Sequence, residues 1–217
     1  MRSIALNIIL LLTFQTIGQE ELRENLWYSL SMKQSIKKQF ELAFDVGYRS
    51  CDRFVDQHRT VLGRLIIEKR INVKHFAGVG FALFDHFNGT WNLEKRPFLQ
   101  YQFKSSIGKM NYGIRFRNEF RFFAINDVFA NRSRLQLATR YSGIHRWLEP
   151  GLSAEAFFTP GSELSYEERY TASVFSKVSN YLVTHIFYTL QRQSAYDVIQ
   201  HIIGFQLQFT IHGSNKE

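Results

Sequence analysis

The chain has 217 residues, a net charge of +8 and one cysteine, and 16% of its residues are aromatic. The single cysteine excludes an intramolecular disulfide. Beyond the first residues, no apolar run approaches the roughly 20 residues of a membrane-spanning helix. The aromatic content, together with a proline count of only 3, favours β-strands.

Residues 1–18 have the pattern of a secretory signal peptide. Arg2 supplies a positive charge, an apolar run follows to Phe14, and the small residues Thr16 and Gly18 precede a cleavage site before Gln19. No cysteine lies at that site, so a lipid anchor there is not expected. We predict that residues 1–18 are a signal peptide and that residues 19–217 form one exported domain.

Apolar and polar residues then alternate with a period of two, which is typical of β-strands. The alternating runs, in chain order, lie at 25–33, 39–49, 60–68, 73–83, 96–104, 112–122, 128–142, 152–159, 166–174, 182–190 and 199–211. The run at 60–68 is the least regular. With flanking residues this makes about eleven strands of roughly ten to fourteen residues, longer than the five or six typical of globular proteins. Because a tilted strand crosses a bilayer in roughly nine to eleven residues, we predict a single antiparallel transmembrane β-barrel.

The number of strands and the links between them bear on this prediction. An odd number would place the first and last strands in parallel contact, whereas single-chain bacterial barrels normally have an even number. We therefore expect a miscount at 60–68 or near the N-terminus and allow about 10–12 strands. Tight links are expected near 37–38, 70–72, 108–109, 144–146 and 179–180, and longer ones near 50–57, 85–92, 126–127, 160–165 and 193–197. Short turns at one end and longer loops at the other are typical of outer-membrane barrels.

Charged residues on four successive runs indicate which face points inward. They share one face of their strands and are Arg115, Arg117, Glu119, Arg121, Arg132, Arg134, Arg140, Glu155, Glu167 and Arg169. An arginine or lysine facing lipid at mid-depth costs about 2–4 kcal/mol, and ten such costs exceed the roughly 5–15 kcal/mol that stabilises a protein. We therefore expect this charge cluster to face the lumen, with Tyr112, Ile114, Phe116, Phe120 and Phe122 facing lipid.

Aromatic residues near strand ends predict the girdles that mark the two membrane interfaces. They are Trp27, Tyr28, Tyr48, Trp91, Tyr112, Trp147 and Tyr181.

Several stretches, in this order along the chain, resemble those of the small exported barrels of domain-of-unknown-function family 2490. They are "LWYSLSMKQSIKKQFELAFDVGYR", "RFRNEFR", "NRSRLQL", "SAEAFF" and "HIIGFQLQF". The resemblance covers nearly the whole chain after the signal peptide. It implies an outer-membrane-type barrel of a Gram-negative bacterium, and it implies no activity.

The charge cluster allows two interpretations of the lumen. In the first, arginines and carboxylates pair across neighbouring strands, so the barrel is structural and partly plugged. In the second, the excess of arginines over acids makes a narrow constriction that favours anions, because rings of arginine or lysine select anions.

Two further hypotheses belong to other classes of protein. An outer-membrane enzyme acting on lipid would need serine, histidine and a carboxylate or carboxamide brought together, and His185 and His201, on the last two runs, are the candidate neighbours. No tight Ser/His motif supports it, and we expect no enzyme. A soluble lipocalin-like barrel that binds an apolar ligand would show the same alternation with its faces reversed.

The residue spacing also bears on cofactors and partners. The single cysteine and the absence of paired histidines predict no metal site, and no glycine-rich phosphate loop predicts a cofactor. Export argues against nucleic acid as the partner of this basic chain. The expected partners are outer-membrane lipid, met by basic residues at the rims such as Lys69, Arg70 and Lys109, and the barrel-assembly machinery during insertion.

Overall fold

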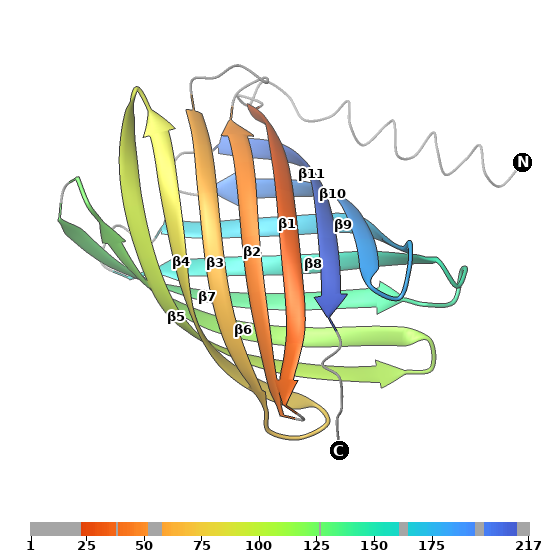
Figure 1. Cartoon of the computed structure of the whole chain (residues 1–217). Helices are drawn as coiled ribbons and strands as arrows, with labels where there is room; N and C mark the ends of the chain where they lie inside the picture. Colours follow the sequence, from red (N-terminus) through yellow and green to blue (C-terminus); the bar gives the residue numbers. More distant parts are fainter. Residues whose placement is uncertain are drawn as a thin grey trace, which may run out of the picture.

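Eleven β-strands form a closed barrel (Figure 1). The computed structural model describes residues 23–37, 39–51, 58–125, 127–160, 165–193 and 198–211, so the predicted signal peptide lies outside the described residues. The strands are β1 (Arg23–Lys37), β2 (Phe40–Cys51), β3 (His58–Arg70), β4 (His75–Asn88), β5 (Thr90–Ile107), β6 (Met110–Phe123), β7 (Val128–Tyr141), β8 (Leu148–Thr159), β9 (Ser165–Lys177), β10 (Leu182–Gln193) and β11 (Val198–Ile211). The predicted all-β barrel is confirmed. The described residues contain no helix that is both long and apolar enough to span a membrane.

The barrel closes through a parallel pair of strands. β1 pairs with β11 in parallel, with Leu26 opposite Ile203 and Leu30 opposite Leu207, and every other neighbouring pair is antiparallel. Figure 1 shows the arrows of β1 and β11 side by side and pointing the same way. The expectation of a miscount was therefore wrong, because residues 60–68 lie within an ordinary strand and the odd number stands. As a consequence, β1 begins at one end of the barrel and β11 finishes at the other.

Link length does not distinguish the two ends of the barrel. The region near 85–92, predicted as a long link, is strand on both sides of Gly89, which alone separates β4 from β5 and has a φ of +76°. The link predicted as tight near 144–146 spans 142–147. We name the two ends after their glycine turns. The Gly89 end carries the start of β1 and the β4–β5 turn, and the Gly108 end carries the β5–β6 turn and the end of β11.

The outer face of the barrel is apolar. On β6, the side chains of Ile114 and Phe116 are 43% and 47% exposed, whereas that of the next residue, Arg117, is only 2% exposed. Similar exposed apolar side chains occur on the other strands, among them Val79, Leu99 and Ile186. The lipocalin-like hypothesis was therefore wrong, because it requires the apolar face inside.

One predicted girdle residue lies on the other face. Trp27 shares the inward face of β1 with Asn25 and Ser31, which are buried, and it lines the central cavity. Tyr28 and Trp91 are outward and about half exposed. The prediction for Trp27 was wrong because strand alternation, and not proximity to a strand end, decides which face a side chain occupies.

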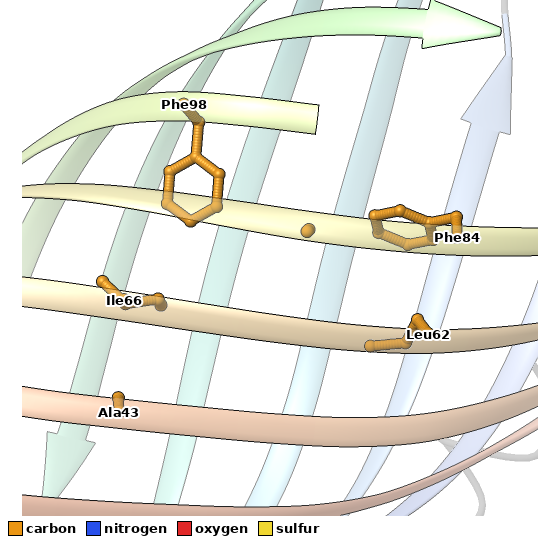
Figure 2. Close-up of a cluster of buried hydrophobic side chains, with 6 residues drawn as sticks. Ala43, Leu62, Ile66, Phe84 and Phe98 are labelled. Atoms are coloured by element: carbon orange, nitrogen blue, oxygen red, sulfur yellow. The ribbon is translucent and has the colours of Figure 1, made fainter. Parts of the chain in front are cut away.

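Apolar side chains on β2–β5 also line part of the lumen, and we call them the apolar wall. They are Ala43, Leu62, Ile66, Ala82, Phe84 and Phe98 (Figure 2). Leu62 and Ile66 face inward while Val61 and Leu65 face outward, so both faces of β3 carry apolar residues. This explains the irregular pattern at 60–68.

Candidate functional site

The ten residues of the predicted charge cluster all lie on inward-facing positions of β6–β9. Register places Glu119 opposite Arg132, and Arg117 opposite Arg134, on β6 and β7. On β8 and β9 it places Glu155 opposite Arg169. Nine of the ten form the charged wall of the lumen, and Arg140 lies apart from them.

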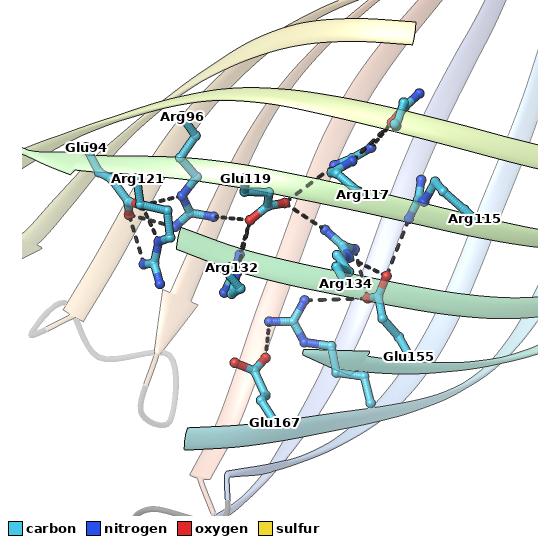
Figure 3. Close-up of polar contacts among 12 residues, drawn as sticks. Glu94, Arg96, Arg115, Arg117, Glu119, Arg121, Arg132, Arg134, Glu155 and Glu167 are labelled. Carbon is cyan, nitrogen blue, oxygen red and sulfur yellow. Dashed lines mark hydrogen bonds and ion pairs between the residues drawn. The ribbon is translucent and has the colours of Figure 1, made fainter. Parts of the chain in front are cut away.

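Two carboxylates hold the charged wall together (Figure 3). Glu119 Oε2 accepts a hydrogen bond of 2.6 Å from Arg132 Nη2, and Glu119 Oε1 lies 3.5 Å from Arg134 Nη1. Glu155 Oε2 accepts a bond of 2.8 Å from Arg134 Nη2. Arg134 therefore connects the two carboxylates across three strands.

Two more arginines of the charged wall, Arg117 and Arg115, lie beside these carboxylates. Arg117 Nη1 lies 3.8 Å from Glu119 Oε1, and Arg117 donates through Nη2 to Gln100 Oε1 at 2.6 Å. Arg115 Nη2 lies 3.4 Å from Glu155 Oε1. Each carboxylate thus lies within ion-pair distance of several guanidinium groups.

Arg140 belongs to a separate group nearer the Gly108 end. Its Nη1 lies 3.5 Å from Glu149 Oε2, and its guanidinium lies 3.5 Å from the centre of the Phe175 ring. Lys177 Nζ contacts the other oxygen of Glu149 at 2.6 Å. The structure therefore does not join Arg140 to the charged wall.

Sequence reasoning missed a further carboxylate, Glu94 on β5, which is fully buried. It accepts hydrogen bonds from Arg96 and from Arg121, whose Nη2 lies 3.2 Å from Oε2, and it lies 3.1 Å from His86 Nε2. The alternation could have revealed it, because Glu94 is an even number of positions from Gln100 and so lies on the same face of β5. It was overlooked because the run was expected to begin at 96.

Aromatic rings, as well as carboxylates, support the arginines. Phe157 lies 4.9 Å from the guanidinium of Arg132 and 4.5 Å from that of Arg169. The apolar wall contributes Phe98, which lies 4.3 Å from Arg117. Ring faces attract a cation without neutralising its charge, so the lumen can hold more arginines than carboxylates.

A central cavity of about 310 Å³ lies inside the barrel, and eight arginines but only three carboxylates line it. The arginines are Arg49, Arg64, Arg96, Arg115, Arg117, Arg132, Arg134 and Arg169, and the carboxylates are Asp45, Glu119 and Glu155. The lining of this cavity is therefore strongly positive.

The central cavity adjoins a larger one of about 640 Å³, which we call the vestibule. Gln136, Ser153, Thr171 and His185 line both cavities. The vestibule also reaches Lys104 and residues of the β3–β4 link, so it lies toward the Gly108 end. The arginine-lined cavity is therefore continued toward one end of the barrel.

The two histidines proposed as neighbours face opposite sides of the barrel wall. His185 points inward, stacked at 4.0 Å on Phe175. His201 is on the outward face, where its Nδ1 hydrogen-bonds to the Tyr188 hydroxyl. Register pairs His201 with Leu190 and His185 with Gln206, so the pair suggested for a lipid enzyme does not form. Among the described residues, no three His, Cys, Asp or Glu side chains are grouped as a metal site.

The closed barrel, with its apolar outer face and charged lumen, defines the class of outer-membrane β-barrel proteins. The chain belongs to the family described as "Protein of unknown function (DUF2490)", whose model matches residues 24–200. This confirms the resemblance seen in the sequence.

Two solved structures are similar to this chain in fold. The NanC porin has a TM-score of 0.52 and 10% identity, covering 82% of this chain and 89% of its own. The KdgM porin in complex with disordered oligogalacturonate has a TM-score of 0.50 and 13% identity, covering 79% of this chain and 89% of its own. A comparison with curated proteins finds no match.

Proposed function

We propose that the protein is a narrow channel in the outer membrane of a Gram-negative bacterium and that it favours small anions. The observation that carries the proposal is the lining of the central cavity, where eight arginines face only three carboxylates. The porin fold of the structural neighbours supports it, and one of those porins was solved with oligogalacturonate, a polyanion.

The physical basis of the preference is the unbalanced charge. Burial lowers the local dielectric constant, so charges in the lumen act on a solute more strongly than they would in water. Rings of arginine favour anions and repel cations. The signal-peptide pattern of residues 1–18 supports export to the outer membrane.

A swelling assay with proteoliposomes tests the channel. Galacturonate and galactose are nearly equal in size and differ by one negative charge, so their relative rates report charge preference. We expect vesicles containing the protein to swell faster in galacturonate than in galactose, and empty vesicles to swell in neither. Equal or faster swelling in galactose would contradict the anion preference.

The second candidate is a structural barrel with a plugged lumen. It is favoured by the way in which Glu119 and Glu155 each bind arginines from more than one strand, because such links hold the wall together whether or not a solute passes. If correctly folded protein produces no swelling in either sugar, this second function replaces the first.

A further inference from the structure

Arg49 on β2 differs from the other arginines of the central cavity. Each of the other seven has a carboxylate oxygen within 4.0 Å. Arg64, for example, contacts Asp45 at 2.7 Å. Within the described residues, Arg49 has no ion pair with a carboxylate. Its guanidinium is therefore available to a solute in the cavity.

Aromatic rings hold Arg49 in place instead. Its guanidinium lies 4.0 Å from the centre of the Trp27 ring and 5.7 Å from that of Phe84. Arg169, from the other side of the lumen, lies 5.3 Å from the same Trp27 ring. Phe187 meets Trp27 edge-on, with ring centres 6.4 Å apart. The Trp27 ring thus contacts two arginines from different strands without neutralising the charge of either.

Gly204 leaves the space for the Phe187 ring beside Trp27. An added Cβ at Gly204 would lie 1.9 Å from Cζ of Phe187, so only glycine leaves room for the ring that supports Trp27. Gly204 is opposite Trp27 in the parallel β1–β11 pair and opposite Phe187 in the β10–β11 pair. The pairing of β1 with β11, which closes the barrel, therefore places Trp27 next to the Phe187 ring that supports it.

The charges around Arg49 are of the same sign. The side-chain charges that act on it most strongly are those of Arg169, Arg96, Arg134 and Arg64. In the same cavity, the Nε of Arg115 is buried and has no hydrogen-bond partner among the described residues. The cavity therefore offers a concentration of positive charge together with unused donors, which an oxyanion would satisfy.

We propose that Arg49 is the central contact of an oxyanion subsite in the lumen, with Trp27 as the platform that positions it. The ligand class is a small solute bearing a carboxylate or phosphate, because the planar guanidinium fork matches both groups. The cavity volume of about 310 Å³ falls at the lower end of small-molecule sites, which span about 300–1,000 Å³. The subsite deepens the proposed function by locating the point where a permeating anion binds.

Trp27 supplies the readout that tests the subsite. The chain has 3 tryptophans, and Trp91 and Trp147 are exposed away from the cavity, so the Trp91→Phe/Trp147→Phe variant leaves Trp27 alone. Its fluorescence is titrated in detergent with galacturonate, with inorganic phosphate and with galactose, at constant ionic strength. We expect a saturable change with one or both anions and none with galactose, and the two anion arms distinguish a carboxylate from a phosphate ligand.

Arg49→Gln in this background is expected to weaken the anion titration at least tenfold. The matched control is Arg59→Gln in the same background, because Arg59 also lies on an aromatic ring, 4.6 Å from the centre of Phe87, but that ring is on the outer face of the barrel. Should Arg49→Gln fail to give the heat-modifiable gel band of a folded barrel, Arg49→Lys is used, with an intermediate loss of affinity expected. An unchanged titration in the folded variant, or no anion-specific change in the parent, overturns the subsite.

The outcome is separable from that of the channel, because the titration needs no transport. Saturable binding without vesicle swelling would contradict the channel and leave the subsite standing. Faster swelling in galacturonate together with an anion titration that Arg49→Gln does not alter would contradict the subsite and leave the channel standing.

Discussion

The apolar wall and the charged wall of the same lumen show how a barrel keeps an excess of positive charge inside. The apolar wall, on β2–β5, contains Phe84 and Phe98, and each of them supports an arginine: Arg96 at 3.7 Å and Arg117 at 4.3 Å. The charged wall, on β6–β9, has too few carboxylates to neutralise its arginines. The two walls therefore depend on each other, and substitutions in either wall test this dependence.

The largest effect is expected from removing the carboxylate that holds the charged wall. Glu119→Gln leaves Arg132 and Arg134 with one partner fewer in a buried site, and breaking such a pair costs about 3–5 kcal/mol. The midpoint of urea unfolding in lipid vesicles, followed by gel mobility, measures the loss. Glu41→Gln is the control, because Glu41 and Lys33 are exposed and 4.0 Å apart. Equal losses for the two variants would contradict a special role for Glu119.

Two neighbouring residues of β7 test which face meets lipid. Leu135 is outward and 40% exposed, so Leu135→Arg should lower the unfolding free energy by about 2–4 kcal/mol. Gln136 lines the cavity, and Gln136→Arg should be tolerated with a clearly smaller loss. The same urea titration compares them, and the reverse order would overturn the assignment of faces.

Packing of the apolar wall depends on Gly80. A Cβ at this position would lie 2.2 Å from Cζ of Phe98 and 2.8 Å from the backbone oxygen of Leu65. Because overpacking typically costs about 1–3 kcal/mol, Gly80→Ala should destabilise the barrel by that amount and displace the ring beneath Arg117. Gly63→Ala is the matched control in the adjacent strand, since its Cβ would meet nothing within 4 Å.

The smallest effect is expected from exchanging the ring on which the charged wall rests. Phe157→Leu keeps an apolar side chain but removes the ring face shared by Arg132, Arg134 and Arg169. Cation–π contacts contribute about 0.5–2 kcal/mol, so we expect a loss of about 1–2 kcal/mol in the urea titration. Phe158→Leu, on the outer face of the same strand, should lose less. A larger loss at Phe158 would mean that the inner ring supports no charge.

The charged wall was predictable from the sequence because its charged residues recur at alternate positions of their strands, opposite a mainly apolar face. On β6, Arg115, Arg117 and Glu119 occupy alternate positions, and the lipid penalty for charge leaves only one orientation. The apolar wall was not predictable in the same way. Leu62 and Ile66 on β3 face the lumen. They weaken the difference in polarity between the two faces of the strand, and strand prediction depends on that difference.

Other features depend on contacts between distant segments. The parallel pairing of β1 with β11 follows from an odd strand number, yet the general preference for even numbers led us to expect a miscount. The partners of Glu94 and the position of Arg49 over Trp27 depend on register across strands, which alternation within one strand does not specify. The separation of His185 from His201 likewise required the register of β10 and β11.

The central claim is that the lumen keeps a positive charge that its carboxylates do not cancel. The reversal potential of the wild-type protein in a planar bilayer, under a tenfold KCl gradient, tests this claim most directly. The account predicts a potential whose sign reports chloride as the preferred ion, and a shift toward zero in Arg49→Gln. A potential that reports preference for potassium would contradict it.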